Sequence, residues 1–459
     1  SCGVWAPDIS WDGEYFWLIY TNIKTRTGGF FNTHNYVVKS KDIRGGWSEP
    51  VYLNSSGFDP SLFHDTDGKK YVVNMINNFK GILVQEYDPV QECLVGEAKN
   101  VFPGTGRNYT EGPHIYHIGE YYYLLMAEGG TSYEHMATMA RSRSIWGPYE
   151  EDPGNPVLTS DVENPEELQK CGHADLVCTQ NGEWYMVHLC ARPPKGTRQC
   201  VLGRETAIQK MVWNEDGWLR LACGGRFGQW ETKEPEGIAE YTFPEEEGKD
   251  YGRDDFGRVL DVRYTSLRQP YDSYASLTER PGYLRLYGQE SLNSCYNVSM
   301  IARRQQARHV QVETSIDFVP TCREQMAGLA YMYDTGNFYL LVKTRDEEYG
   351  CPSLDLKIPA KLRLIRSSHF AVDDVIPPIA IPENGPLFLR TVTTEDGLHA
   401  KFYYSLDGQN FRELAEVPTN ILTDEQSEGF TGAHFGMYCH DMTGGRKWAD
   451  FDYFEILRK

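Results

Sequence analysis

The sequence predicts an all-β protein in which a β-propeller is followed by a β-sandwich. Three observations support this fold class. An aromatic strand that follows a tight turn recurs four times in the first half, the recurrences lie roughly 50–60 residues apart, and short alternating strands fill the second half. The 459 residues exceed one ordinary hydrophobic core, so at least two domains are expected.

The repeat in the first half has a constant design. Each copy begins with a short strand and continues through a turn into a longer aromatic strand, and Asp-Gly and Asn-Gly between apolar runs are strong hairpin signals. The four short strands are "APDIS" (6–10), "DPSLF" (59–63), "GPHIY" (112–116) and "HADLV" (173–177). The stretches "KSKDIRGGWSEP" (39–50) and "RSRSIWGPYE" (141–150) also resemble each other and predict an outer strand of a blade. This spacing is typical of propeller blades.

The repeats assign residues 1–240 to the propeller and predict where its functional groups lie. The first strand of each blade lines the central channel, so residues at the start of these strands gather at one mouth. Asp8, Asp59, Glu111 and His173 occupy such positions. The acids recur because the blades recur, and the sequence predicts one polar site built from them.

The character of the chain changes after residue 240. The charged, Gly-containing stretch 242–256 is expected to be a linker or a domain entry. Beyond it, alternating apolar and polar residues predict short antiparallel strands. Examples are "HVQVETSIDF" (309–318), "FYLLVKTR" (338–345) and the closing "GRKWADFDYFEI" (445–456). Residues 250–459 are therefore expected to form a β-sandwich.

Composition excludes several classes of function. The net charge of −20 argues against nucleic acid or an anionic membrane as the main partner. No apolar run approaches the roughly 18 residues that a membrane helix needs. The 11 cysteines contain no C-x-x-C pair, so a zinc ribbon or a redox motif is not predicted, and reduced thiols in a cytoplasmic protein are the simplest interpretation.

Paired acids at a wet, aromatic-lined mouth indicate glycoside hydrolysis. That reaction needs one protonated carboxyl group to donate to the leaving oxygen and one ionised carboxylate on the other face of the sugar. Glu111 is the predicted acid, because its apolar neighbours or a nearby carboxylate raise the pKa of its carboxyl group. Asp59 is the predicted neighbouring carboxylate or base.

Three further residues have alternative interpretations that the sequence leaves open. Trp5 either forms a wall on which a sugar stacks or is an aromatic residue of the propeller core. Arg204 either contacts a carboxylate or a sugar hydroxyl, or it forms a surface salt bridge. His173 either binds a metal or is a structural histidine with satisfied hydrogen bonds.

Together these residues resemble glycoside hydrolase family 43, in particular its β-xylosidase and α-L-arabinofuranosidase members with a C-terminal β-sandwich. The matching stretches run along the whole chain. They are "GVWAPD", "HNYVV", "LNSSGFDPSLFHDTDGKKYVVNM", "TEGPHIY", "YYYLLMAEGGTSYEH", "GHADLV", "LGRETAIQK" and "FTGAHFGMYCHDMTGGRKWADFDYF".

The resemblance implies a five-bladed propeller followed by a concanavalin-like sandwich, and inverting chemistry that needs no cofactor. It implies that Glu111 is the general acid and that Asp59 orients this acid and tunes its pKa. Substrate contacts carried over from the family are Trp5, Ala6, Thr131 and Arg204. His173 matches a channel histidine that lies near a bound cation, often calcium, in several relatives.

Two positions depart from the family pattern in ways that affect selectivity. His434, in the sandwich stretch that reaches the pocket in relatives, stands where an aromatic residue is expected. Asp175 stands where a small polar residue is expected.

The family's general base lies in an early stretch like "N-P-D-P-S" at the head of the first blade, and this chain has no such stretch. The nearest match, Asp59-Pro60-Ser61, already corresponds to the second acid. The first blade is therefore expected to be largely absent. We favour a fragment of a longer enzyme, and the alternatives are a separate N-terminal segment that completes the propeller, or loss of the base. Asp8 is a weaker candidate for a substitute base.

The predicted function is an exo-acting, inverting hydrolase that releases β-D-xylose or α-L-arabinofuranose from xylo-oligosaccharides or arabinoxylan fragments. A catalytically silent carbohydrate-binding protein is the alternative. A phosphorolytic enzyme would need a basic cluster in the pocket, and only Arg204 offers a cation there. We expect a homo-oligomer, and neither nucleic acid nor a membrane as a partner.

Overall fold

The computed structural model describes residues 2–164, 168–237, 251–345, 360–427 and 429–459. Within these ranges the regular structure consists of β-strands and three single-turn 3-10 helices, η1 (Gly28–Phe30), η2 (Tyr271–Ser273) and η3 (Asn420–Leu422). No helix in the described part of the chain has the length and apolar character needed to cross a membrane. The chain divides into two compact units, Ser1–Arg192 with Glu205–Ala239 and Pro193–Arg204 with Glu240–Lys459. The predicted boundary at 240–250 had placed residues 193–204 in the first unit.

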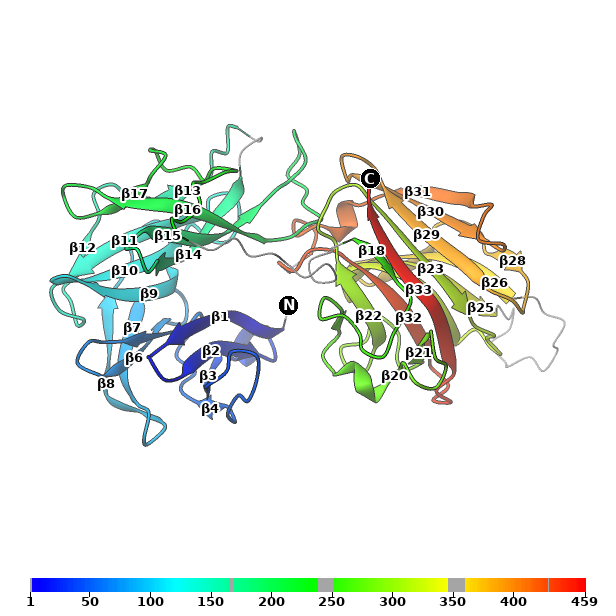
Figure 1. The fold of residues 1–459 in the computed structure, drawn as a ribbon, viewed down its shortest axis with the longest axis horizontal. Helices are drawn as coiled ribbons and strands as arrows, with labels where there is room; N and C mark the ends of the chain where they lie inside the picture. Colours follow the sequence, from blue (N-terminus) through cyan, green and yellow to red (C-terminus); the bar gives the residue numbers. More distant parts are fainter. Residues whose placement is uncertain (1, 165–167, 238–250, 346–359, 428) are drawn as a thin grey trace. The chain divides into compact units, whose positions relative to one another are not determined.

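The first unit contains four antiparallel sheets of consecutive strands (Figure 1). The first sheet has β1 (Gly3–Trp11), β2 (Phe16–Ile23), β3 (His34–Ser40) and β4 (Val51–Tyr52), and the second has β5 (Ser61–His64), β6 (Lys70–Met75), β7 (Ile82–Asp88) and β8 (Cys93–Phe102). The third has β9 (Glu111–Ile118), β10 (Tyr121–Glu128), β11 (Met136–Ser142) and β12 (Glu150–Glu151), with β13 (Leu158–Thr159) on β11, and the fourth has β14 (Gln169–Cys178), β15 (Trp184–Ala191), β16 (Glu205–Trp213) and β17 (Leu219–Leu221). The predicted propeller arrangement is confirmed with four blades.

Apolar side chains on both faces of each blade pack against the neighbouring blades. Successive residues of a strand point to opposite faces, so each blade presents one apolar face to the blade before it and one to the blade after it. In β6, Val72 belongs to the apolar cluster with Trp17 of the first blade, and Val73 belongs to the cluster with Leu124 of the third. A third cluster joins the third and fourth blades through Leu125 and other buried side chains.

The second unit consists of two sheets, which confirms the predicted sandwich (Figure 1). One sheet has the order β20-β21-β33-β23-β29-β30-β31, with β18 on β33, and the other has β19-β22-β32-β24-β25-β26-β27, with β28 on β26. The bounds are β18 (Gly252–Asp254), β19 (Thr265–Ser266), β20 (Ala275–Ser276), β21 (Leu284–Tyr287), β22 (Ser299–Arg304), β23 (Val310–Asp317), β24 (Gln325–Asp334), β25 (Asn337–Arg345), β26 (Ala360–Ser368), β27 (Ala371–Asp374), β28 (Ile379–Ile381), β29 (Leu387–Thr393), β30 (His399–Ser405), β31 (Arg412–Pro418), β32 (His434–Asp441) and β33 (Trp448–Arg458).

The last two strands of the chain occupy the interior of the two sheets rather than an edge. β32 pairs with β22 and β24, and β33 pairs with β21 and β23. The sandwich therefore depends on the end of the chain for both of its sheets. Of the predicted linker at 242–256, residues 242–250 lie outside the described residues, and the remainder contains β18.

Candidate active site

The heads of the four innermost strands share one backbone feature. Ala6, Asp59, Gly112 and His173 occupy the same position of the sequence repeat, and all four have positive φ, at 34°, 50°, 53° and 46°. Pairing is interrupted at this point in β1, β9 and β14. A left-handed residue is uncommon outside glycine, and a bulge at a strand end re-aims the neighbouring side chains. The repeat therefore encodes a kink that sets the direction of the side chains at the channel mouth.

Gly112 joins three blades at this mouth. Its N–H donates a hydrogen bond of 3.3 Å to Asp59 Oδ2 of the second blade. A Cβ atom on Gly112 would lie 2.8 Å from Nε2 of His173 in the fourth blade, which is closer than side chains approach. Only glycine fits both the positive φ and this approach. The residue after Glu111 thereby brings Asp59, Glu111 and His173 together, as the repeat predicted for these three residues.

The two acids of this group are buried near each other, so the ionisation of both at once is unfavourable. Glu111 is 6% exposed and Asp59 is 7% exposed. Burial and then the nearby Asp59 carboxylate raise the pKa of Glu111 well above its usual value. Burial also raises the pKa of Asp59, whereas His173, the Gly112 N–H and His114 lower it. The raised pKa of Glu111 favours its protonated form, and Asp59 has groups around it that favour its anion.

Burial and Asp59 act on the pKa of His173 in opposite directions. Burial lowers the pKa of the imidazole, and the Asp59 carboxylate raises it less. His173 and Asp59 therefore influence each other electrostatically across two blades.

The effect of Asp59 on Glu111 can be tested through the pH profile. A general acid must be protonated, so kcat/KM falls as pH rises through the raised pKa of Glu111. Asp59→Asn removes the negative charge that helps to raise this pKa. The basic limb of the profile is therefore expected to move to lower pH by about one unit or more. Asp67→Asn, in an exposed turn of the same blade, is the control, and an unmoved basic limb in Asp59→Asn would show that Asp59 does not tune Glu111.

Trp5 lies on the rim of the first blade in an aromatic group. Its ring centroid is 5.6 Å from that of Phe58, edge to face, and 6.1 Å from that of Phe31. The guanidinium carbon of Arg26 lies 5.3 Å from the ring centroid. Trp5 is half-buried and next to the left-handed Ala6, which fits the predicted wall better than a core position. Sequence reasoning missed Phe31 and Arg26, because their loop lies outside the repeat.

Thr131 lies in the connection between β10 and β11, on the blade that carries Glu111. It follows Gly129 and Gly130, which both have positive φ. The N–H of Gly129 donates to the carbonyl oxygen of Asn108 at 2.9 Å, so this connection is fixed to the segment that leads into Glu111. The predicted role of Thr131 in substrate binding stays a prediction.

Arg204 and His434 belong to the second unit. Arg204 is buried in an ion pair with Asp424, and its guanidinium carbon lies 5.0 Å from the ring centroid of Phe430. The surface salt bridge considered for Arg204 is therefore wrong. His434 begins β32, its Nδ1–H donates to the carbonyl oxygen of Gly432 at 3.0 Å, and burial lowers its pKa to about 4. Both residues therefore contact the loop that contains Phe430 and Gly432. Asp424 was not predicted from the sequence.

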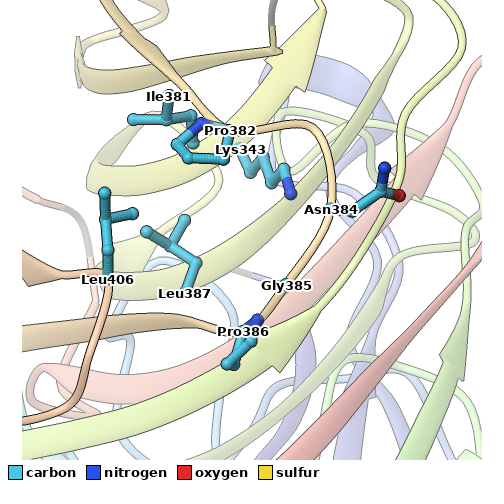
Figure 2. A pocket seen from close by; sticks show the side chains of 8 residues that line it. All are labelled: Lys343, Ile381, Pro382, Asn384, Gly385, Pro386, Leu387 and Leu406. Atoms are coloured by element: carbon cyan, nitrogen blue, oxygen red, sulfur yellow. The ribbon is translucent and has the colours of Figure 1, made fainter.

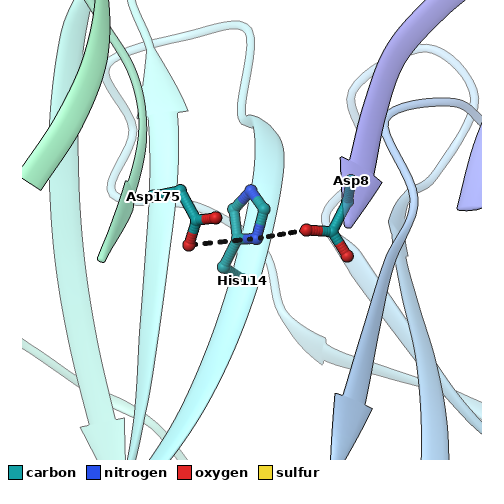
Figure 3. A group of neighbouring side chains, drawn as sticks. All are labelled: Asp8, His114 and Asp175. Carbon is teal, nitrogen blue, oxygen red and sulfur yellow. Dashed lines mark ion pairs between the residues drawn. The ribbon is translucent and has the colours of Figure 1, made fainter. Parts of the chain in front are cut away.

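A second polar group lies two residues further along three of the inner strands. Asp8, His114 and Asp175 each offer a ligand atom within 4.8 Å of the others. Figure 3 shows His114 between the two carboxylates. All three residues occupy the third position of the repeat, so the register of the repeat could have identified the group, of which only Asp8 was singled out for this mouth. Asp8 also accepts the N–H of Leu62 at 3.1 Å, and Asp175 accepts the hydroxyl of Tyr116. Burial raises the pKa of Asp8.

The ligand atoms of this group lie at distances that a shared cation could bridge. His114 Nδ1 lies 3.9 Å from Asp8 Oδ1 and 3.7 Å from Asp175 Oδ1, beyond hydrogen-bond length. Calcium–oxygen bonds of about 2.3–2.6 Å bring adjacent ligand atoms to about 3–4 Å from one another. These residues, rather than His173 alone, are the ones that could hold the expected cation.

The second unit has a hollow of about 70 Å³ between the loop after β28 and β25 (Figure 2). Lys343 reaches into it and donates to the carbonyl oxygen of Glu383 at 2.7 Å, and burial lowers its pKa to about 8. The other lining residues are apolar or small, with the amide of Asn384. Among the described residues no carboxylate lines this hollow, so those residues do not supply the groups for glycoside hydrolysis.

Family models of known proteins match both parts of the chain. The model of "Glycosyl hydrolases family 43" matches residues 1–219, and that of "Beta xylosidase C-terminal Concanavalin A-like domain" matches residues 253–457. The chain is 43% identical to a β-xylosidase of Bacillus subtilis, covering 100% of this chain and 87% of that protein. It is 33% identical to a non-reducing end α-L-arabinofuranosidase of Bacteroides ovatus, covering 99% and 81%.

A solved structure extends the likeness to three dimensions. The crystal structure of a xylan β-1,4-xylosidase from Bacillus halodurans superposes with a TM-score of 0.92 at 44% identity, covering 100% of this chain and 87% of that one. Identity at this level along the whole chain, together with a buried acid pair at the propeller mouth, identifies the protein as a glycosidase that belongs to glycoside hydrolase family 43.

Proposed function

We propose that this glycosidase releases single β-D-xylosyl or α-L-arabinofuranosyl units from the non-reducing ends of xylo-oligosaccharides or arabinoxylan fragments, with inversion at the anomeric carbon. The observation that carries the proposal is the buried pair of Glu111 and Asp59, in which burial and the Asp59 carboxylate raise the pKa of Glu111. Relatives named as β-xylosidase and α-L-arabinofuranosidase support the choice of sugars.

In this mechanism Glu111 donates its proton to the glycosidic oxygen as the bond to the anomeric carbon breaks. Asp59 holds the proton on Glu111 before the reaction through electrostatic repulsion and then faces the newly formed Glu111 carboxylate. A general base on the opposite face of the sugar removes a proton from the attacking water. Inversion requires the acid and the base to stand about 6.5–9.5 Å apart, with the water between base and sugar.

The function is tested by the products. The protein is incubated with nitrophenyl β-xyloside, nitrophenyl α-L-arabinofuranoside and xylobiose, and proton NMR records the anomer that is released first. Inversion gives α-xylose from a β-xyloside. First release of β-xylose would contradict inversion, and binding of these sugars without turnover in a preparation of verified intact mass would favour the silent carbohydrate-binding protein.

We further propose that a fifth blade completes the propeller and supplies the general base. Two apolar blade faces of the first unit are exposed: Trp11 of β1 is 49% exposed and Ile208 of β16 is 43% exposed. Val4 and Ile9 of β1, Val177 of β14 and Val212 of β16 are exposed on the same two blades. Large exposed apolar surfaces mark interaction sites.

The exposed face of the first blade carries aromatic and aliphatic side chains in contact across strands, as buried sheet faces do. Tyr20 of β2 stacks on Tyr36 of β3 at 5.8 Å, and Tyr36 contacts Tyr52 of β4 at 5.7 Å. Ile9 pairs with Leu18 across β1 and β2 on this face. Such cross-strand aromatic and aliphatic pairs are the units that stabilise a covered sheet face. A further four-stranded sheet would bury this face and that of the fourth blade.

Asp8 does not replace the base in this proposal. Its carboxylate accepts the Leu62 N–H and faces His114, and it lies beyond Ala6 along β1. We propose instead that Asp8, His114 and Asp175 bind a divalent cation such as calcium in the channel. The cation would hold the inner strands of three blades together, while proton transfer stays with Glu111.

Calcium is therefore expected to raise the melting temperature of the protein. Binding at about 100 times the Kd stabilises the folded state by about 2.7 kcal/mol, and a chelator reverses the effect. Differential scanning calorimetry with and without calcium after treatment with a chelator measures it. Asp8→Asn should lose the response, whereas Asp67→Asn in an exposed turn should keep it. Equal responses of these two variants, or none in the unmodified protein, would contradict the site.

The homo-oligomeric state and the cytoplasmic location stay predictions.

A further inference from the structure

The hollow beside Lys343, about 70 Å³ in volume, has walls from both sheets of the sandwich. Lys343 belongs to β25 of one sheet, Leu387 begins β29 of the other, and Leu406 directly follows β30 of that second sheet. The loop after β28 forms the rest of the wall, and Figure 2 shows the Lys343 side chain reaching toward this loop. A single water needs about 10–15 Å³, so the hollow can hold a molecule of several heavy atoms.

Lys343 is a buried cation with one hydrogen bond. Its side chain is 1% exposed, and its Nζ donates to the carbonyl oxygen of Glu383 at 2.7 Å. An ammonium group has three donors. In the described part of the chain, Lys343 makes no ion pair and no second hydrogen bond. Two of its three N–H donors are therefore left to a molecule that enters the hollow.

The carboxylates near Lys343 are paired with other cations. Glu383 Oε1 accepts a hydrogen bond of 2.6 Å from Arg345, which is also 1% exposed, and Asp317 pairs with Arg280 at 2.9 Å. Both carboxylates act on Lys343 through space, but burial outweighs them and lowers the pKa of the amine to about 8.

Lys343 and Arg345 thus place two buried cations beside the single carboxylate of Glu383. The two residues lie two positions apart on β25, so their side chains leave the same face of the strand. Buried charges in proteins are paired, because an unpaired charge away from water is unfavourable. A small anion in the hollow would supply the second negative charge.

The remaining wall suits a short apolar group next to that charge. The apolar lining residues are Ile381, Pro382, Pro386, Leu387 and Leu406. The side-chain amide of Asn384 also lines the hollow and makes no hydrogen bond with the described residues. Asn384 is exposed and Leu406 is 45% exposed, so this side of the hollow borders solvent and a ligand can enter without separating the sheets.

We propose that this hollow binds a small monocarboxylate, such as acetate or propionate. The carboxylate accepts hydrogen bonds from the Lys343 ammonium and the Asn384 amide, and the alkyl end contacts Leu387 and Leu406. Hydrogen bonds between charged groups are stronger than neutral ones. Sites for larger ligands measure about 300–1,000 Å³, so a hollow of this size selects a small anion rather than a sugar.

Calorimetric titration of the full chain with sodium acetate tests the site. Sodium chloride keeps the ionic strength constant. We expect acetate to bind once per chain and, at about ten times the Kd, to raise the melting temperature by about 3 °C or more. An equal concentration of sodium chloride should not produce this rise. If chloride alone reproduces it, or if acetate does not bind, the proposal is overturned.

Variants locate the bound anion. Lys343→Met keeps the length of the side chain without its charge and should weaken acetate binding about tenfold or more, the loss of a hydrogen bond to a charged group. Lys361→Met, on the neighbouring strand β26, is the matched control and should bind as the unmodified protein does. Leu406→Trp fills the hollow from its exposed side, leaves the charges in place and should also weaken binding. Unchanged binding in Lys343→Met or Leu406→Trp, or an equal loss in Lys361→Met, would place the anion elsewhere.

The dependence on pH provides a further test in the unmodified protein. Acetate affinity should fall as pH rises through about 8, because the amine of Lys343 then loses the charge that holds the anion. The charged groups that face Lys343 or its partners are Arg345, Glu383, Asp317 and Arg280, and side chains of these types ordinarily titrate far from this pH. An acetate affinity that stays constant across this range would show that Lys343 does not hold the anion.

Discussion

Replacing Glu111 with Gln is expected to lower kcat/KM for xylobiose by roughly 10²–10⁴-fold, the usual contribution of a general acid. Glutamine keeps the size of the side chain at this buried position but has no proton that it can donate to the leaving oxygen. The pKa of Glu111 is raised by burial and by Asp59, which is the state a proton donor requires at neutral pH. Initial rates on xylobiose measure the loss.

The dependence on the leaving group distinguishes proton donation from damage to the fold. A dinitrophenolate leaves without protonation, so Glu111→Gln should retain far more of its activity on dinitrophenyl β-xyloside than on xylobiose. Glu120→Gln, in the exposed turn of the same hairpin, is the matched control and should behave like the unmodified protein. Unchanged xylobiose hydrolysis in Glu111→Gln, or equal losses on both substrates, would contradict the assignment.

Supplying a first blade is expected to have the second large effect. A polypeptide designed as the predicted further blade, with the early stretch like "N-P-D-P-S" that the family resemblance implies, is added separately or fused before Val4. It should raise kcat/KM by roughly 10²–10⁴-fold through its general base. The added blade should also raise the melting temperature of the protein, because it covers the apolar faces that contain the exposed Trp11 and Ile208. Enzyme assays and calorimetry measure the two effects.

The control for this experiment is the same blade with its predicted base replaced by alanine. This variant should stabilise the protein as well as the unmodified blade does but should not restore turnover. If the added blade neither binds nor stabilises the protein, a fifth blade in this position is excluded. If both blades stabilise it and neither restores turnover, the base does not come from the added blade.

Much of the propeller could be predicted because its signals are local. The turn residues and alternating strands at 66–75 and 180–189 depend on neighbours within a few positions, and both became hairpins. The repeat also predicted that Asp59, Glu111 and His173 meet at one mouth. The same register, followed two residues further, would have added His114 and Asp175.

The assignment of 193–204 could not be made in the same way. This segment lies between two strands of the fourth blade, β15 and β16, so its position in the sequence suggested the propeller. Its contacts are with the sandwich unit: Arg204 pairs with Asp424, and the Cys200 N–H donates to Glu425 at 3.0 Å. More than 200 positions separate the two residues of each pair, so no local sequence pattern predicts these contacts.

The sequence by itself determined the class of strands, the repeat that defines the blades and the two acids at strand heads. Only the tertiary structure decided the environments of the two acids, because the pKa of Glu111 depends on its burial and Asp59 accepts the Gly112 N–H from another blade. It also decided that Lys343 and Leu406 line one hollow. Strand periodicity and turn chemistry act between adjacent residues, whereas desolvation and charge act through space between residues that the fold brings together.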